Sequence, residues 1–489
     1  MSDRIIQDLV PFLKFTIAPY AFLEIAVFCF MVVLSAVLFL YRRQLLVCSK
    51  KRKVETPGTL VGNFGVSVVI PAYNEAATIV DSLETVLAQN HADFEVIVVN
   101  DASKDETLAI LTERFALFEK AMVAEERLSS TEVLATYMSA TQPNLVVVDK
   151  AYSGKGKGDA LNVGMSFGNR QLLCVLDADS LLHPDSLAKL AMPFSEDNQV
   201  IAAGGAIRAG NGRSVAEILS GKPPKIWNPL VFGQMMEYAR IFFVDRLNFS
   251  CLNCNVIISG AFGMFDRQAM FAVGGYQCDN LAEDMALTMR LHRHFLERKS
   301  PYRIVHVPEA QCWTEVPFNL RLLYRQRTRW HAGYVQSAIE NVDLLFKPAF
   351  GVYANFALPY CLSLALEPLF LVASLTLFYN FFASNGLSSG VIGGYFAVHS
   401  LLSMTYIIAF IVSNEFHRKL GFRSWAVPFW AFPVWLVFGR VYDTVNMTLR
   451  LAGLVKYLRK ERTWGEMDRV GFQKTMPKSR SVQVASVGR

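Results

Sequence analysis

Two aspartates separated by one residue are the clearest chemical signal in the chain. Asp177 and Asp179 follow directly after the apolar run Leu172–Leu176. In an extended segment, side chains two residues apart point the same way, so these carboxylates would repel each other unless a cation lies between them. Carboxylate oxygens suit Mg²⁺ or Mn²⁺, which commonly bind through one or two carboxylates and substrate phosphates. A solvated acidic turn is the alternative, but the position at the end of an apolar strand favours a metal site.

A glycine- and lysine-rich segment lies shortly before this pair. Residues 153–162 read SGKGKGDALN. Glycines let the backbone approach a phosphate closely, and the lysines supply positive charge. The spacing of a P-loop is absent. The segment therefore indicates a phosphate-binding loop of another type, with a flexible basic loop as the alternative.

Two further groups of polar residues lie in predicted helices. Glu283 and Asp284 open an amphipathic helix, where acidic residues are also favoured simply by the helix dipole. Gln326, Arg329 and Trp330 are spaced i, i+3 and i+4, which places them on one helical face. An amide, a guanidinium and an indole together suit an uncharged polyol. Interfacial anchoring by Trp and Arg is the alternative for this face.

The elements that must position these residues can be predicted from apolar runs. Four runs each end in a polar cluster, and they are Val66–Ile70, Phe94–Val99, Asn144–Val148 and Leu172–Leu176. Helical patterns lie between them, at Thr78–Gln89, from Glu106 to about Glu126, and at Asp159–Phe167. Apolar strands that alternate with helices predict a parallel sheet covered on both faces, with ligands beyond the carboxyl ends of the strands. Lys120–Ser139 is expected to be an additional helical insertion.

The composition indicates a membrane protein with a large water-soluble part. Of the 489 residues, 52% are hydrophobic and 18% are charged, against about 45–50% and about 25% in ordinary soluble domains. The 36 Phe, 17 Tyr and 7 Trp exclude a disordered chain. The formal net charge of +6 does not suggest nucleic acid as a partner, and the eight scattered Cys are no disulfide framework.

Apolar segments divide the chain. Ala21–Tyr41 is long enough for one crossing, and the basic residues after it place the following domain in the cytoplasm. Two more crossings are expected at about 352–383 and 393–412. In the last range, 425–446, the apolar segment Trp425–Gly439 has only about 15 residues, a length that fits an interfacial or re-entrant helix better than a crossing. The predicted parts are a membrane anchor (1–45), a cytoplasmic domain (60–315), interfacial helices (316–350), transmembrane or interfacial helices (351–450) and a cytoplasmic basic tail (451–489).

Six motifs in this order resemble the membrane-embedded, processive type of family 2 glycosyltransferase, which includes cellulose, hyaluronan, chitin and poly-N-acetylglucosamine synthases. The motifs are PAYNE (71–75), NDASKD (100–105), GKGDALN (156–162), DAD (177–179), AED (282–284) and QRTRW (326–330). The resemblance runs from about Val66 to Trp330. It implies an α/β fold of the GT-A type, with a Rossmann-like, mostly parallel sheet and flanking transmembrane helices.

The resemblance implies a role for each motif. Tyr73 and Asp101 would hold the uridine of the donor, Lys157 would meet its diphosphate, and Glu75 and Asp177 would also bind the donor. Asp177 and Asp179 would hold Mg²⁺ or Mn²⁺. Asp284 would be the general base for the acceptor hydroxyl, with Glu283 as the catalytic residue beside it. Gln326, Arg329 and Trp330 would bind the acceptor sugar and the pyrophosphate.

The function expected from this resemblance is inverting transfer of glucose or N-acetylglucosamine from a UDP-sugar to a growing polysaccharide, with possible coupling to secretion. The alternatives are transfer of one sugar to a lipid carrier and a non-enzymatic role as an accessory sugar-nucleotide-binding subunit. The expected partners are the UDP-sugar, the polysaccharide, the lipid bilayer and either a second copy or an export subunit. A bacterial inner membrane is the expected location.

Overall fold

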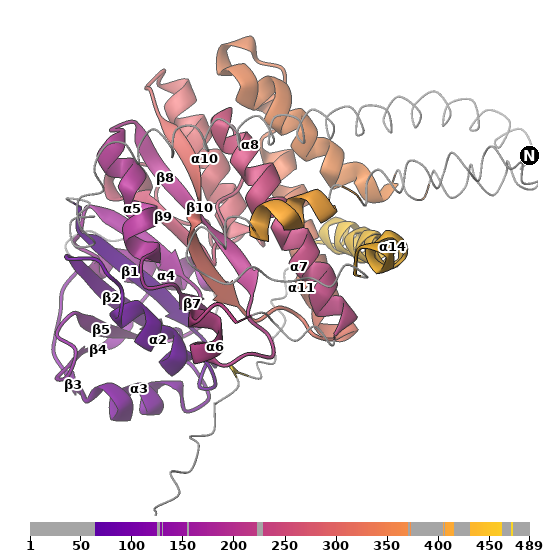
Figure 1. Cartoon of the computed structure of the whole chain (residues 1–489). Helices are drawn as coiled ribbons and strands as arrows, with labels where there is room; N and C mark the ends of the chain where they lie inside the picture. Colours follow the sequence, from indigo (N-terminus) through magenta and orange to yellow (C-terminus); the bar gives the residue numbers. More distant parts are fainter. Residues whose placement is uncertain are drawn as a thin grey trace, which may run out of the picture.

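The computed structural model describes residues 64–472, apart from residues 125–127, 130, 154–155, 223–227, 370–371, 373–403, 405, 415–430 and 462–470. Within this part, one twisted sheet of ten strands forms the centre of the molecule, and helices cover both of its faces (Figure 1). In order across the sheet, the strands are β3 (Leu117–Glu119), β4 (Val133–Ser139), β5 (Leu145–Lys150), β2 (Phe94–Asn100), β1 (Val66–Ala72), β6 (Leu172–Leu176), β9 (Phe262–Asp266), β8 (Val200–Ala209), β10 (Arg303–Thr314) and β7 (Ser180–Leu182).

The four strands predicted from the sequence form the parallel half of this sheet. β1 pairs in parallel with β2 and β6, and β2 pairs in parallel with β5. Their apolar side chains are almost all buried, as expected for strands covered on both faces. Polar residues follow each of these strands, so the predicted clusters lie along one edge of the sheet.

The expectation of a mostly parallel sheet is wrong for the molecule as a whole. β9 pairs antiparallel with both β6 and β8, and β4 pairs antiparallel with β5. The sheet is therefore mixed. The reason is that β9 lies between the two parallel parts, and its direction is set by the connections on either side rather than by its own apolar pattern.

The α-helices around this sheet come from distant parts of the chain. They are α2 (Ile79–Leu87), α3 (Thr107–Phe115), α4 (Gly156–Phe167), α5 (Ser186–Glu196), α6 (Val215–Leu219), α7 (Pro229–Arg240), α8 (Arg246–Cys251), α9 (Arg267–Ala272), α10 (Glu283–Glu297), α11 (Leu320–Glu340) and α14 (Ala431–Leu458). α7, α11 and α14 lie together at one end of the sheet (Figure 1).

The predicted helical insertion at Lys120–Ser139 is not a helix where the structure describes it. α3 ends at Phe115 because Ala116 adopts a left-handed conformation (φ 48°), and β3 follows directly. The second part of the segment forms β4, which pairs with β5. Because β4 is partly exposed, its apolar pattern is less regular than that of the buried strands and does not distinguish it from a helix.

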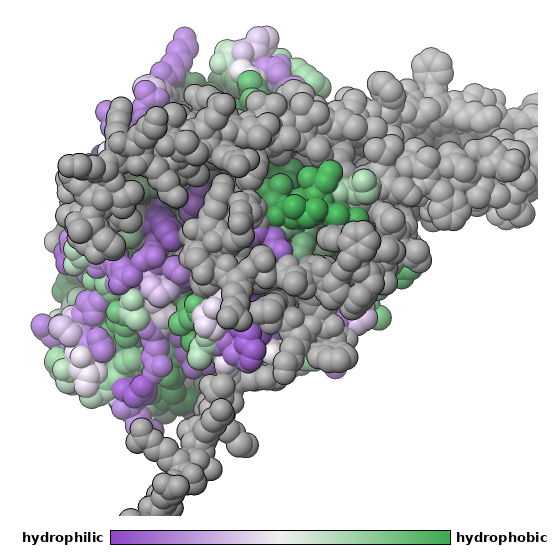
Figure 2. Space-filling model, viewed as in Figure 1, coloured by the Kyte–Doolittle hydropathy of each residue, from purple (hydrophilic) through white to green (hydrophobic). Residues whose placement is uncertain are grey.

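The membrane segments are only partly described. The predicted crossing at Ala21–Tyr41 lies outside the described residues, as do residues 370–371 and 373–383 of the second predicted crossing and most of 393–412. α14 continues to Leu458, beyond the predicted boundary at residue 450. Among the described residues, no helix is both long enough and apolar enough to cross a membrane. Figure 2 shows an apolar patch over the helix at 406–414, where Ile408 and Ile411 are exposed.

Candidate active site

The aspartate pair lies at the carboxyl end of β6, but not in an extended segment as expected. The backbone N–H of Ser180 donates to the carbonyl oxygen of Asp177 over 3.0 Å, which closes a turn. Asp179 is only 1% exposed, whereas Asp177 is partly exposed. The two carboxylates therefore face different surroundings. Their oxygen donors fit a hard divalent cation.

Lys157 contacts one of these aspartates. It lies in the first turn of α4, and its ammonium donates to Asp177 Oδ1 and, over 3.1 Å, to the carbonyl oxygen of Gly260. Burial alone would lower the pKa of Lys157, but Asp177 and Glu283 outweigh burial and hold it above its ordinary value. The side chain is therefore a fixed positive charge at neutral pH.

Glu283 and Asp284 lie on the other side of this lysine. Glu283 Oε1 is 4.0 Å from the Lys157 ammonium. The Asp284 carboxylate accepts from the backbone N–H of Gly260 through Oδ2 (2.9 Å) and from its neighbour Met285 through Oδ1 (2.8 Å). Glu283 is buried and Asp284 is partly exposed. Of the two, Asp284 is therefore the one that a substrate hydroxyl can reach.

The turn before these acids packs against α11. A Cβ at Gly333 of α11 would come within 2.4 Å of the backbone nitrogen of Ala282. Only a glycine permits this approach, so the helix that carries QRTRW lies directly against the turn that carries Glu283. Burial is the largest effect on the pKa of Glu283 and raises it, and the negative charge of Asp284 raises it further. The positive charges of Lys157 and, less strongly, Arg329 lower this pKa, but the net pKa stays above its ordinary value. The predicted acceptor face and the acidic pair are therefore parts of one site.

The three residues of the predicted acceptor face differ in exposure. Gln326 is buried, whereas Arg329 and Trp330 are partly exposed. The side-chain oxygen of Gln326 has no hydrogen-bond partner among the described residues. A buried acceptor without a partner is costly, which favours a hydrogen bond to a ligand at this position.

Sequence reasoning missed Arg327, which follows Gln326 in the same motif. Arg327 forms a bidentate ion pair with Glu237 of α7 (2.8 and 2.7 Å), and the Tyr442 hydroxyl of α14 donates to the same carboxylate over 2.7 Å. The Arg327 guanidinium also lies 4.7 Å from the centre of the Trp330 ring. The only available signal was that charged residues within buried helix faces are almost always paired.

Arg246 of α8 was also missed. Burial lowers the pKa of this guanidinium to about 10, and the negative charge of Asp284 is the largest effect that counters it. The guanidinium lies over the Phe242 ring, 4.3 Å from its centre. Arg246 is therefore an additional cation on the Asp284 side of the site, and no motif pointed to it.

The predicted nucleoside residues lie in the loops after β1 and β2. Hydrogen bonds join these loops: Asn74 N–H donates to Ser103 Oγ (3.1 Å) and Glu75 N–H to Thr107 Oγ1 (3.0 Å). The Glu75 carboxylate accepts from the Thr78 hydroxyl over 2.7 Å at the start of α2. Glu75 therefore has a local role in building the loop, whereas Tyr73 is partly exposed beside it.

Asp101 is buried and paired. Its carboxylate accepts from the Lys150 ammonium (2.5 Å) and from the Ser153 hydroxyl (3.0 Å). The structure thus brings Asp177, Lys157, Glu283 and Asp284 into direct contact or close approach. Asp101 is not among these residues. It pairs with Lys150, which also contacts Asp159 in the first turn of α4, the turn that carries Lys157.

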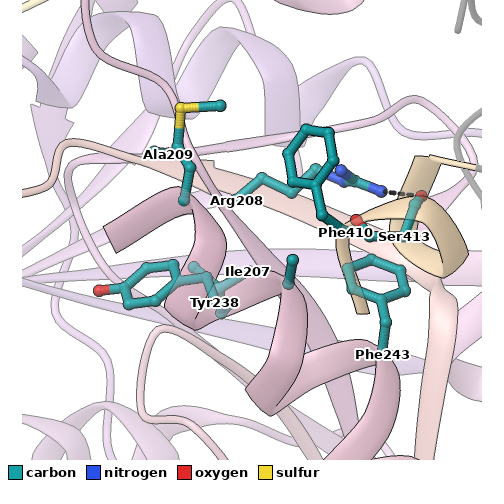
Figure 3. Close-up of a pocket in the computed structure, with 9 residues that line it drawn as sticks. Ile207, Arg208, Ala209, Tyr238, Phe243, Phe410 and Ser413 are labelled. Atoms are coloured by element: carbon teal, nitrogen blue, oxygen red, sulfur yellow. Dashed lines mark hydrogen bonds between the residues drawn. The ribbon is translucent and has the colours of Figure 1, made fainter. Parts of the chain in front are cut away.

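A small cavity lies elsewhere, between β8, α7 and the helix at 406–414 (Figure 3). Arg208 points into it and donates to the carbonyl oxygen of Ser413 (3.0 Å) and to Gln311 Oε1 (2.9 Å). Its guanidinium lies 4.6 Å from the centre of the Phe243 ring. The residues that line this cavity include none of those predicted for the site.

Comparison with known proteins gives a consistent picture. The family described as glycosyltransferase like family 2 matches residues 63–333. Poly-beta-1,6-N-acetyl-D-glucosamine synthase of Staphylococcus epidermidis is 28% identical over 293 residues, which cover 60% of this chain and 58% of that protein. The protein of the same name from Staphylococcus aureus (strain COL) is 27% identical over 269 residues, or 55% of this chain and 54% of that protein. The chain thus spans less than two thirds of the length of these relatives.

Among solved structures, a mannosyltransferase from Pyrobaculum calidifontis in complex with GDP-Man and Mn²⁺ shares the fold. The TM-score is 0.52 at 19% sequence identity, and the match covers 89% of this chain and 99% of that chain. At this identity the similarity concerns the fold alone, which is a GT-A-like α/β fold with a mixed sheet.

Proposed function

Because the chain belongs to the glycosyltransferase-like family 2, we propose that it transfers a hexose from a UDP-sugar to the end of a growing β-linked polysaccharide. The relatives named above favour N-acetylglucosamine as the sugar, and glucose is the alternative. The observation that carries the proposal is the convergence of Lys157, Asp177 and Asp284 around Gly260. This convergence supports the proposal because a cation for the diphosphate, a carboxylate for the nucleotide and a base for the acceptor would then lie on one small surface.

On the donor side, Lys157 would bind the diphosphate. Its pKa is held above the ordinary value, so its charge is available to stabilise the negative charge that builds up on the leaving UDP. Asp177 and Asp179 would hold Mg²⁺ or Mn²⁺, which would supply further positive charge to the diphosphate. Among the described residues, no group of three or more His, Cys, Asp or Glu side chains is arranged to hold a metal ion. Further ligands for the ion would therefore be phosphate oxygens and water.

On the acceptor side, Asp284 would take the proton of the attacking hydroxyl. The hydrogen bond from Gly260 fixes Oδ2, and the carboxylate stays accessible from the site. Trp330 and Gln326 would bind the sugar that carries this hydroxyl. A single displacement of this kind inverts the anomeric carbon, so an α-linked donor gives a β-linked product.

The proposed setting is the bacterial inner membrane, with this site in the cytoplasm. The support is the apolar pattern of the sequence together with the exposed apolar patch in Figure 2. A second copy or an export subunit would complete a path for the polymer. Separation of membranes from the soluble fraction, followed by protease accessibility from each side, tests this setting.

The function is tested by UDP release from the purified full chain in detergent or nanodiscs. UDP-N-acetylglucosamine and UDP-glucose are added separately with Mg²⁺ or Mn²⁺, and the products are sized on a gel. We expect a long polymer from one donor, and a rate about 10²–10⁴-fold lower for Asp284→Asn, which is the usual contribution of a general base. A single-sugar product in the lipid extract would support transfer to a lipid carrier. UDP binding without turnover would contradict the proposal.

A further inference from the structure

The side chain of Lys150 at the end of β5 is completely buried between two carboxylates. Its ammonium lies 2.5 Å from Asp101 Oδ1 and 2.7 Å from Asp159 Oδ2, and its side chain is 0% exposed. The carboxylates are themselves only 7% and 3% exposed. A buried ammonium at two carboxylates is a fixed geometry, because separating any of the three would leave an uncompensated charge in the interior.

One end of this group belongs to the predicted nucleoside-binding loop. Asp101 follows β2, and its backbone N–H donates to the carbonyl oxygen of Ala72 at the end of β1 (2.8 Å). Its second carboxylate oxygen accepts from Ser153 (3.0 Å). Lys150 therefore holds the carboxylate that, by the family resemblance, would contact the uridine of the proposed donor.

The other end belongs to the helix turn that carries the phosphate-facing lysine. Asp159 lies in the first turn of α4, two residues after Lys157. Its carboxylate also accepts from the hydroxyls of Ser129 (2.6 Å) and Thr131 (2.9 Å). Burial alone would raise the pKa of Asp159, but hydrogen bonds from Lys150 and Ser129 outweigh burial and keep it below its ordinary value.

We propose that Lys150 is a positioning residue that couples the nucleoside loop to the diphosphate-facing turn of α4, through Asp101 and Asp159. This inference rests on the proposed function, because it assigns the two ends of the group to the two parts of UDP. Ser129 and Thr131 give a role to the segment at 120–139. Together with Lys150 they hold the Asp159 carboxylate, so this segment supports the turn from which Lys157 would reach the diphosphate.

The physical consequence is that the two halves of the nucleotide site cannot move independently. A shift of α4 that carried Asp159 away would break a charge-assisted hydrogen bond to Lys150, and such bonds are the strong ones in proteins. A shift of the Asp101 loop would do the same at the other end. The uridine and the diphosphate of the donor would therefore be bound at a constant separation.

The test compares ligands that occupy one half or both halves. Binding of uridine and of UDP with Mg²⁺ to the full chain is measured by calorimetry for the wild type, Lys150→Met and Asp159→Asn. For Lys150→Met we expect affinity about tenfold or more weaker for both ligands, the size of one hydrogen bond to a charged group. For Asp159→Asn we expect uridine binding within about threefold of the wild type and a larger loss for UDP. Lys222→Met, which breaks a surface pair with Glu217, is the matched control.

A double variant distinguishes a loss of folding stability from a loss of positioning. Lys150→Met/Asp159→Asn removes one positive and one negative charge together, so its thermal midpoint should recover relative to Lys150→Met. Uridine binding should remain weak in it. Recovery of wild-type uridine affinity would mean that Lys150 only offsets the charge of Asp159, and the proposal would be overturned. Equal affinities for wild type and Lys150→Met would also overturn it. A wild-type chain that binds no UDP would instead disprove the proposed function, so the two failures are distinguishable.

Discussion

At the scale of single residues, Glu283 and Asp284 are adjacent in sequence but chemically different. Glu283 is buried beneath Lys157, whereas Asp284 is partly exposed and oriented by Gly260. Burial is the main reason that the pKa of Glu283 is raised above its ordinary value, and Asp284 adds to it. A buried acid next to an accessible acid allows one of them to support the site while the other meets the substrate.

This difference predicts opposite effects of Glu283→Gln on stability and on activity. With a folded-state pKa above its ordinary value of 4.5, Glu283 favours folding at low pH, and this contribution is lost as the pH rises through the raised value. At neutral pH the amide should therefore give a higher thermal midpoint than the wild type, with the gain disappearing near pH 4. Transfer should fall by at least about tenfold, because the charge facing Lys157 is lost.

Thermal unfolding at several pH values checks the stability effect, and UDP release checks the activity. Glu84→Gln is the control, because Glu84 is half-exposed in a surface pair with Arg114 and should change the midpoint little at any pH. A midpoint difference for Glu283→Gln that is the same at pH 4 and at neutral pH would contradict the interpretation.

At the scale of elements, the predicted acceptor face depends on a contact among three helices. The side chains of Glu237, Arg327 and Tyr442 come from α7, α11 and α14 and are all buried. Two glycines let these helices approach: Gly233 faces the Tyr442 ring, and Gly453 lies against the Thr328 backbone. α14 is therefore part of the support for Trp330, although it is distant in sequence.

We expect substitutions among Glu237, Arg327 and Tyr442 to weaken acceptor binding while leaving donor binding unchanged. Tyr442→Phe removes one hydrogen bond to a carboxylate and should lower the free energy of unfolding by about 1.5–3 kcal/mol. Arg327→Met leaves a buried carboxylate without its cation and should cost about 3–5 kcal/mol. Because Trp330 is supported from this side, Tyr442→Phe should also shorten the product while the affinity for UDP is unchanged.

Chemical denaturation, product sizing and UDP calorimetry on the same preparation test this prediction. Tyr457→Phe, also on α14, provides a matched control. An unchanged product length in Tyr442→Phe, or a loss of UDP affinity equal to the loss of polymer length, would show that the group does not act through the acceptor face.

At the scale of the whole molecule, the proposed donor site joins elements that are far apart in the sequence. The loops after β1 and β2, the first turn of α4 and the turn after β6 all lie at one edge of the sheet. A ligand that contacts all of them should stabilise the entire domain, since binding to the folded state alone adds RT ln(1 + [L]/Kd) to its stability.

UDP with Mg²⁺ should therefore raise the thermal midpoint. The free energy of unfolding should increase by about 2.7 kcal/mol at a hundredfold excess of ligand over Kd. EDTA should remove the part of this increase that depends on the metal. Asp177→Asn should lose the metal-dependent part, while Asp343→Asn, an exposed ion-pair carboxylate, should keep it. Scanning calorimetry with and without EDTA measures both parts. A shift that is insensitive to EDTA would argue against a metal held by Asp177.

The sequence by itself determined the features that depend on local pattern. The four parallel strands, α4 from Asp159 onward, the start of α10 and the helix with QRTRW could be predicted, because apolar runs and helical spacing are properties of neighbouring residues. The first turn of α4, which carries Lys157, was expected to be a loop. The site residues could be proposed because polar clusters ended the strands. Carboxyl ends of parallel strands meet at one edge of the sheet, which brings such clusters together.

Only the tertiary structure decided what depends on partners distant in the chain. The antiparallel insertion of β9, the strand within 120–139, the pairing of Lys157 with Asp177 and the burial of Lys150 and Arg327 all arise from such contacts. A lysine or an arginine in a sequence looks the same whether it is solvated or buried at a carboxylate. Its role is set by the desolvation and pairing that the folded chain imposes, and those are not local properties.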